Sequence, residues 1–152
     1  MHRVLFVLPL ALSACTLTES SDSETRPVGQ TRLSRAALQT ARDEPVSFTE
    51  HVKPILEAKC AMCHNSSALP GRMSLENRRS AEKSGTLGAF IVPGQPDESL
   101  FVNNLKSAHS SIQAMPPVGE RITREEIEVL RKWIREGAPW PAGPEGDLHT
   151  SS

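Results

Sequence analysis

Two cysteines and a histidine lie close together in the stretch CAMCH, residues 60–64. Cys60 and Cys63 are three positions apart, and His64 follows directly. Thiols and imidazoles are the side chains that proteins use for redox exchange and for binding metals. The chain has only one further cysteine, Cys15, so this short turn holds most of its thiol chemistry.

Four kinds of chemistry use a Cys-x-x-Cys pair, and the rest of the sequence helps to separate them. A redox dithiol of the thioredoxin type requires a βαβ context, which the sequence lacks. A structural zinc site requires four ligands, and neither a second cysteine pair nor a closely spaced histidine pair is present. A disulfide between Cys60 and Cys63 leaves His64 without a role. The pattern Cys-x-x-Cys-His is typical of covalent c-type haem attachment, which uses all three side chains.

A c-type haem would engage each residue of the motif in a defined way. The thiols of Cys60 and Cys63 would form thioethers with the two vinyl groups, and His64 would then face the iron as its proximal ligand. Aromatic residues make up only 4% of the chain, so a bound apolar cofactor would also help to fill a thin core. We therefore predict one covalently bound haem c.

The ligand on the other face of the iron decides between an electron carrier and a haem enzyme. The candidates by residue type are Met62, Met73, Met115, His51 and His109. Met115 is favoured because two prolines follow it, exclude a helix and stiffen the loop that would hold its thioether. Met73 and His109 are alternatives, whereas Met62 lies inside the attachment turn, on the wrong side of the haem. A histidine–methionine pair raises the reduction potential and leaves no open position on the iron, which suits one-electron transfer.

The best-defined element that would position these residues is a helix over residues 124–136. Thr123 and Glu126 have the spacing of a capping box. The apolar positions repeat at helical spacing and are Ile127, Leu130 and Ile134. Gly137 is expected to end this helix.

Two further helices are predicted on either side of the motif along the chain. Apolar positions favour a helix over residues 48–59 that leads into Cys60, and Pro54 requires this helix to kink or to start close by. Another helix is expected over residues 98–106, with Leu100, Phe101 and Leu105 facing inward and Asp97 as its cap.

The intervening segment, residues 65–94, contains several glycines and prolines and is expected to be mostly loop. No segment of any length shows the alternating pattern of a strand. The sequence therefore predicts a small, loop-rich, all-α domain wrapped around the haem.

Several pieces of this region also match the pattern of a known family. They are Phe48 with Pro54-Ile55-Leu56, the motif Cys60-Ala61-Met62-Cys63-His64, Arg72-Met73-Ser74-Leu75, Ile91-Val92-Pro93-Gly94 with Pro96 and Ser99-Leu100, Met115-Pro116-Pro117, Glu126-Ile127 with Leu130, Trp133-Ile134, and Gly137-Ala138-Pro139-Trp140-Pro141. Over residues 48–141 the chain resembles a class I c-type cytochrome, most closely the planctomycete-type cytochrome c domain. The resemblance implies an all-α fold around a haem c, with His64 as proximal and Met115 as distal ligand. One departure is Gly71-Arg72-Met73, where the family usually has a glycine pair and an aliphatic residue.

The first 14 residues are expected to be a signal peptide. A short positive head precedes an apolar run that is shorter than the roughly 20 residues of a transmembrane helix. The run ends in Leu12-Ser13-Ala14-Cys15, which resembles the lipobox of bacterial lipoproteins, so cleavage would fall before Cys15 and lipid would be attached to its sulfur. A plain signal peptide with an incidental cysteine is the alternative. Thr16 stands where an aspartate would signal retention in the inner membrane, which favours the outer membrane.

The remaining boundaries follow from composition. Residues 15–45 contain the lipidated cysteine and a polar, disordered linker. Residues 46–141 are expected to form the cytochrome c domain that the resemblance implies, and residues 142–152 a flexible tail. The linker would let a membrane-bound domain reach a partner without diffusing away.

The charge balance bears on the choice of partners. With 17 basic and 18 acidic residues the net charge is −1, which gives no long-range attraction to nucleic acid. The favoured function is that of a periplasmic, membrane-tethered electron carrier, not an enzyme, between a dehydrogenase or another cytochrome and a terminal oxidase. A haem enzyme or sensor of the peroxidase type, with a displaceable distal ligand, is the alternative. A third alternative is a binding module in which the haem serves mainly as core.

Overall fold

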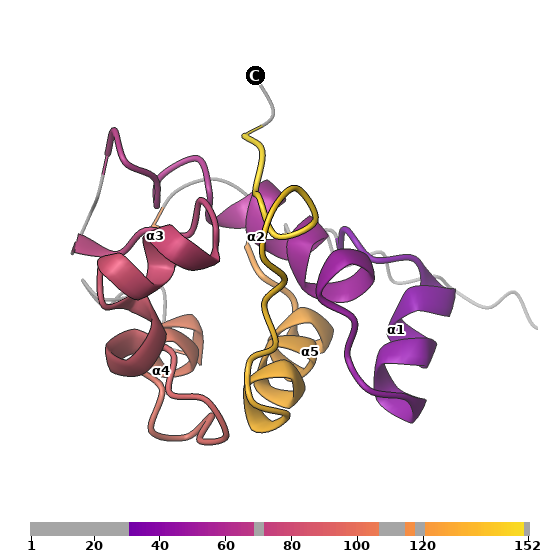
Figure 1. The fold of residues 1–152 in the computed structure, drawn as a ribbon. Helices are drawn as coiled ribbons and strands as arrows, with labels where there is room; N and C mark the ends of the chain where they lie inside the picture. The colour runs from indigo at the N-terminus through magenta and orange to yellow at the C-terminus, as the bar shows by residue number, and fades with distance from the viewer. Residues whose placement is uncertain (1–30, 69–71, 107–114, 118–120, 151–152) are drawn as a thin grey trace, which may run out of the picture.

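Figure 1 shows the computed structural model of the protein, which describes residues 31–68, 72–106, 115–117 and 121–150. The elements in chain order are α1 (Arg35–Asp43), η1 (Phe48–Val52), α2 (Lys53–Lys59), α3 (Arg78–Lys83), η3 (Thr86–Phe90), α4 (Leu100–Lys106) and α5 (Arg124–Arg135). The α elements are helices, η1 is a short π-helical turn, and η3 is a turn interrupted by non-helical backbone at Leu87 and Gly88. The described residues contain no sheet, only an isolated bridge between Leu87 and Ile91. The predicted all-α fold class is confirmed.

Helix α5 begins with the predicted cap. The Thr123 hydroxyl accepts a hydrogen bond from the Glu126 amide at 3.2 Å, and the Glu126 carboxylate accepts one from the Thr123 amide at 2.9 Å. At the other end, Gly137 adopts a φ of +96°, and its amide donates to the carbonyl of Ile134 at 2.9 Å. A side chain disfavours this backbone conformation, which explains why a glycine follows the helix.

The helix predicted before the motif is divided in two near its proline. The hydroxyl of Ser47 caps η1 by accepting a hydrogen bond from the Glu50 amide at 3.3 Å. Helix α2 then starts at Lys53, with Pro54 in its first turn. Proline is tolerated there because the first amides of a helix have no partner within it. Helix α2 therefore begins close to Pro54 and ends immediately before Cys60.

Three aromatic rings form the part of the core that joins η1 to α5 and to the segment after it. The ring centroid of Phe48 lies 4.9 Å from that of Trp140 and 6.1 Å from that of Trp133. Both indoles are also hydrogen-bonded, with Trp133 Nε1 donating to the Pro139 carbonyl at 3.0 Å and Trp140 Nε1 donating to the Gly146 carbonyl at 2.8 Å. The indoles therefore pack their rings and satisfy their polar atoms at the same time.

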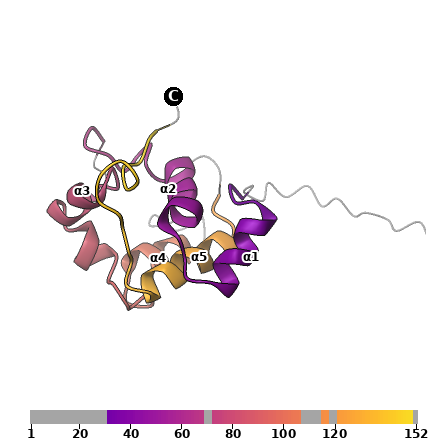
Figure 2. The ribbon, with the colours of Figure 1, turned by 45° about the vertical axis from the view of Figure 1, so that its right-hand side comes forward.

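Helix α1 lies within the segment that the sequence assigned to a disordered linker. Its first turn is capped by the Ser34 hydroxyl, which accepts a hydrogen bond from the Ala37 amide at 3.1 Å. Leu33 and Ala41 are buried in the core. Figure 2 shows α1 beside α5, and the two helices are in contact. The linker prediction for residues 15–45 therefore does not hold from Leu33 onward, because Leu33 and Ala41 are buried in the core and α1 packs against α5.

The C-terminal residues also differ from their prediction as a flexible tail. In Figure 1 the yellow segment runs back from α5 past α2. The Leu148 amide donates to the Glu76 carbonyl at 2.7 Å, and the His149 amide donates to the Glu57 carboxylate at 2.9 Å. Lys53 Nζ reaches the Pro144 carbonyl at 3.3 Å. Residues 142–150 are therefore bound to the domain by hydrogen bonds that composition alone does not indicate.

Helix α4 packs against α5 and differs from its prediction in two respects. Leu100, expected to face inward, is half exposed, whereas Phe101, Val102 and Leu105 are buried. Asp97, expected to cap the helix, pairs with Arg131 of α5. Among the described helices, none is long and apolar enough to cross a membrane.

Candidate functional site

The motif turn follows directly from the end of α2. The amides of Cys60 and Ala61 both donate to the Leu56 carbonyl, at 2.9 and 2.8 Å, and so continue the helix by one step. The amides of Cys63 and His64 then both donate to the Cys60 carbonyl, at 3.1 and 2.9 Å. The three predicted site residues are thus brought together in one tight turn that the helix holds in place.

Asn65 closes this turn from the other side, a role that the sequence analysis missed. Its side-chain nitrogen, Nδ2, donates to the carbonyls of Ala61 and Met62, at 3.0 and 2.8 Å. Its side-chain oxygen accepts hydrogen bonds from the amides of Ser67 and Ala68, at 2.9 and 3.1 Å. Asparagine followed by small polar residues is typical of such turns, and that signal was present in the sequence.

His64 is buried, with 7% of its surface exposed. Burial lowers the pKa of the His64 imidazole from its ordinary value. A contact with the backbone of Met73 acts in the opposite direction. Nδ1 is in fact buried with no hydrogen-bond partner among the described residues. A neutral imidazole with an unpaired nitrogen is the form that binds a metal ion.

The two thiols of the motif are free in the structure. Cys60 is buried and Cys63 is half-buried. Burial, followed by the charge of Glu126, raises the pKa of the Cys60 thiol to about 12, while Lys59 acts in the opposite direction. The Cys60 side chain is therefore neutral at physiological pH and behaves as a small apolar group.

Lys59 and Glu126 form an ion pair next to the motif. Lys59 Nζ and Glu126 Oε2 are 2.7 Å apart, and neither side chain has exposed surface. Lys59 as a whole residue is only half-buried, so its remaining exposure lies on its backbone. The sequence pattern predicts that Glu126 belongs to a cap but does not indicate its burial, because a pair so distant in sequence leaves no local signal.

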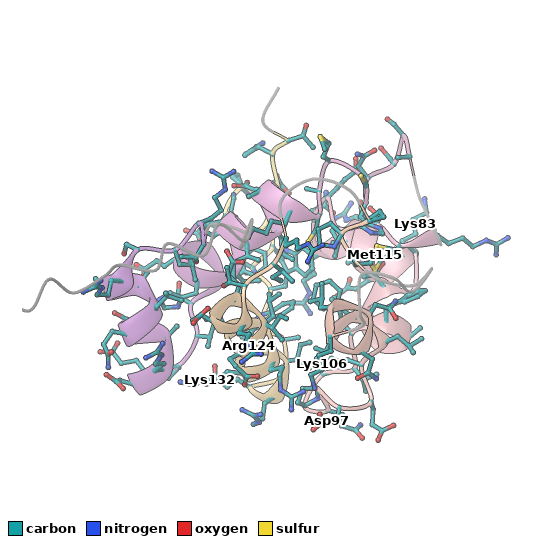
Figure 3. The ribbon with its side chains drawn as sticks, turned by 180° about the vertical axis from the view of Figure 1, so that it is seen from behind. Lys83, Asp97, Lys106, Met115, Arg124 and Lys132 are labelled. Carbon is teal, nitrogen blue, oxygen red and sulfur yellow. The ribbon has the colours of Figure 1, made fainter. Side chains whose placement is uncertain are left out.

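The candidates for the second axial ligand occupy different surroundings. Met115 is half-buried against the core, and its amide donates to the Asn104 carbonyl at 3.3 Å. Figure 3 shows Met115 above α4, on the same side of the molecule as Lys83 of α3. Met73 is buried in the core, and Met62 has 67% of its surface exposed.

The two histidine candidates are distinguished in another way. His51 is buried in η1, and its Nδ1 accepts a hydrogen bond from the Ser47 amide at 3.0 Å, so that nitrogen already has a partner. His109 and the predicted lipidation residue Cys15 both lie outside the described residues.

These observations test whether the residues fit a haem. Two free thiols and a buried imidazole with an unpaired nitrogen share one turn, as covalent attachment and axial ligation require. The described part of the chain contains no group of three or more His, Cys, Asp or Glu residues that could hold a metal ion without a cofactor. The residues of the turn therefore fit the cofactor predicted from the motif.

The described helices and the motif turn are consistent with a c-type cytochrome domain. The family model described as planctomycete cytochrome C matches residues 60–119 of this chain. The matched segment begins at Cys60 and includes Met115. This match supports a c-type cytochrome domain, as the resemblance in the sequence predicted.

The chain is also similar to part of a much longer protein. It is 27% identical over 153 aligned positions to hydrazine synthase subunit alpha from Kuenenia stuttgartiensis. The alignment covers 81% of this chain and 19% of the relative, so the chain spans about a fifth of that protein's length. No solved structure matches the chain.

Proposed function

We propose that this protein is a membrane-tethered, mono-haem c-type cytochrome of the bacterial periplasm that carries single electrons between redox partners. A haem c supplies a single iron that accepts one electron on going from the ferric to the ferrous state and gives it up again. The partners of this exchange would be a dehydrogenase or another cytochrome on one side and a cytochrome or terminal oxidase on the other. Neither partner would exchange atoms with the protein.

The observation that carries this proposal is the turn of residues 60–64. Cys60 and Cys63 would hold the haem through thioethers, and His64 would be its proximal ligand. The backbone hydrogen bonds from Cys63 and His64 to the Cys60 carbonyl keep this turn in one conformation. A rigid attachment favours electron transfer because little rearrangement would accompany the change of oxidation state.

Met115 is the proposed distal ligand. It has a weakly basic thioether and is half-buried against the core. With both axial positions filled, the iron would change its charge without binding or releasing a ligand. The chain would then be a carrier and not an enzyme.

The location follows from chemistry outside the described residues. Lipid on Cys15 would hold the protein at a membrane, with the outer membrane favoured by Thr16. Because Leu33 is already buried in the core, the tether would be shorter than the 30 residues between Cys15 and residue 45. The domain would therefore work close to the membrane surface.

A second candidate function is that of a haem domain within an enzyme. The likeness to hydrazine synthase subunit alpha favours it, because that relative is by name a subunit of a synthase. In this case the distal ligand would leave the iron to admit a small molecule.

A redox titration followed by visible spectroscopy separates the two candidates. A carrier is expected to show a charge-transfer band from methionine to ferric iron, a reversible one-electron wave and no rapid binding of carbon monoxide. Fast binding of carbon monoxide by the native ferrous protein would instead favour the enzyme. A colourless preparation of the secreted protein, or a pigment extracted by acidified organic solvent, would contradict both.

A further inference from the structure

The ion pair between Lys59 and Glu126 is unusual because both charges lie in the interior. Their nearest atoms are 2.7 Å apart, and the exposed fraction of each side chain is zero. Moving two charges out of water is costly, and their attraction offsets that cost only with close geometry and further hydrogen bonds. A solvated surface would have held the same two side chains at far lower cost.

Further hydrogen bonds are present on both members of the pair. Lys59 Nζ also donates to the Arg121 carbonyl at 2.7 Å. Glu126 Oε2 accepts from the Thr123 amide at 2.9 Å, and Glu126 Oε1 accepts from the Arg32 amide at 3.0 Å. The pair thus joins the end of α2, the start of α5 and the chain just before α1.

The position of the pair places two buried charges beside the haem-attachment turn. Lys59 is the residue immediately before Cys60. After burial itself, the charges that act on the Cys60 thiol are those of Glu126, which raises its pKa, and Lys59, which lowers it. The two charges therefore act on the motif in opposite directions and partly cancel.

We propose that Lys59 and Glu126 shift the reduction potential of the haem held by Cys60 in opposite directions and balance each other, an inference that rests on the proposed function. Reduction adds one electron, so the net charge at the iron becomes more negative by one. A nearby positive charge stabilises the ferrous state and a negative charge stabilises the ferric state, and both effects are stronger in a low-dielectric interior. Lys59 and Glu126 would act through their electric field and not as ligands of the iron.

The test uses the full holoprotein and measures its midpoint potential at neutral pH by spectroelectrochemical titration. Lys59→Met leaves the carboxylate without its partner, so the potential is expected to fall. Glu126→Gln leaves the ammonium alone, so the potential is expected to rise. The double variant Lys59→Met/Glu126→Gln carries neither charge and is expected to lie between them, near the wild-type potential. A shift of about 59 mV corresponds to a tenfold change in the ferrous-to-ferric ratio at fixed ambient potential.

Two further variants guard the interpretation. A buried amine that loses its counter-charge tends to release its proton, so Lys59→Arg/Glu126→Gln places a permanent positive charge at the same position. It supplies the upward shift even if the Glu126→Gln variant loses the lysine charge. Glu125→Gln is the matched control, because Glu125 is exposed on the same turn of α5 and its removal is expected to change the potential much less.

Opposite shifts separate a field effect from a loosened fold. If the pair served only to hold α2 against α5, every disrupting variant would expose the haem and move the potential in one direction. Shifts of one sign in the variants of opposite charge, or shifts no larger than that of Glu125→Gln, would overturn the inference. A normal c-type haem spectrum in those same variants would leave the proposed function intact, so the two failures are distinguishable.

Discussion

The amide of Leu75 donates a hydrogen bond to the carbonyl of His64, with nitrogen and oxygen 2.9 Å apart. Leu75 is completely buried, so this bond joins the motif turn to the core. The backbone amide of His64 also donates a hydrogen bond to the Cys60 carbonyl. The fold therefore positions His64 through its main chain, and its imidazole would remain available for the proposed ligation.

Replacing His64 by alanine tests whether its imidazole, and not its backbone, is needed to hold the haem. His64→Ala keeps both backbone hydrogen bonds but removes the proposed proximal ligand, so stable haem incorporation is expected to be lost. The haem content per protein, measured by the pyridine haemochrome spectrum, is expected to fall at least tenfold. His149→Ala is the control, because His149 is exposed and contacts Glu57 through its backbone amide. An unchanged haem content in His64→Ala would show that another residue binds the iron.

A second prediction concerns Met115. Met115→Ala removes the proposed distal thioether, so the charge-transfer band from sulfur to ferric iron is expected to disappear and the potential to fall. Carbon monoxide should then bind rapidly to the ferrous protein, because one axial position becomes open. Met62→Ala is the control, since Met62 lies in the motif turn but is largely exposed. Loss of the band in Met73→Ala but not in Met115→Ala would show that Met73 is the ligand.

The sequence was sufficient to predict the features that depend on local chemistry. The cap of α5, its end at Gly137 and the start of α2 near Pro54 each follow from one residue and its immediate neighbours. The motif turn is equally local, since its hydrogen bonds span at most five residues. The class of fold follows from these elements and from the absence of strand patterns.

The features that were missed depend on contacts between distant parts of the chain. Helix α1 carries only a small apolar stripe, and its docking depends on residues of α5 about 90 positions away. The C-terminal residues look like a loose tail in composition, yet Leu148 is held by a carbonyl 72 positions earlier, that of Glu76. No local pattern in the sequence encodes such partners, and for the same reason the burial of Glu126 was not foreseen.

Lys132 provides a test of how α1 is held. Its Nζ donates to the carbonyls of Ala41, Arg42 and Glu44, at 2.9, 3.0 and 2.6 Å, and Figure 3 shows it between α1 and α5. A cation at the last carbonyls of a helix satisfies acceptors that have no partner within it. Lys132→Met is expected to destabilise the protein by about 1–2 kcal/mol. Hydrogen exchange in residues 35–43 is expected to accelerate more than exchange in α5.

Arg135→Met is the matched control for this prediction. Arg135 lies in the last turn of the same helix but is exposed, so its replacement is expected to leave exchange in α1 nearly unchanged. Equal acceleration in α1 and α5 after Lys132→Met would instead show that α1 does not open independently. Measuring both variants by mass spectrometry at one pH separates the two cases.

Gly146 is expected to tolerate no side chain. A Cβ atom at this position would overlap the Pro141 carbonyl oxygen, which belongs to the backbone and cannot move aside alone. The Gly146 carbonyl also accepts the hydrogen bond from Trp140 Nε1. Gly146→Ala is therefore expected to cost about 1–3 kcal/mol in unfolding free energy and to change tryptophan fluorescence. Ala142→Ser, at an exposed position of the same segment, should change neither.

The last prediction concerns the exposed pairing of Asp97 with Arg131, which joins the segment before α4 to α5. Arg131 Nη1 and Asp97 Oδ1 are 2.8 Å apart, and Lys106 Nζ lies 3.7 Å from the same oxygen. The contact with the Arg131 guanidinium is the main cause that lowers the pKa of the Asp97 carboxyl, and the charge of Lys106 contributes less. Nη1 has no hydrogen-bond partner among the described residues, so the contact is treated as an ion pair.

The direction of the pH effect follows from that lowered pKa. A carboxyl that is more acidic in the folded than in the unfolded protein adds stability above its unfolded pKa, and this contribution is lost as the pH falls through its folded pKa. Asp97→Asn is therefore expected to lower the melting temperature slightly at pH 7, and the difference from wild type should vanish in acid, below the ordinary aspartate range. High salt at pH 7 should also reduce the difference, because the carboxylate is exposed to solvent. A difference that persists unchanged in both acid and high salt would show that the asparagine disturbs the α4–α5 packing and not the charge pairing.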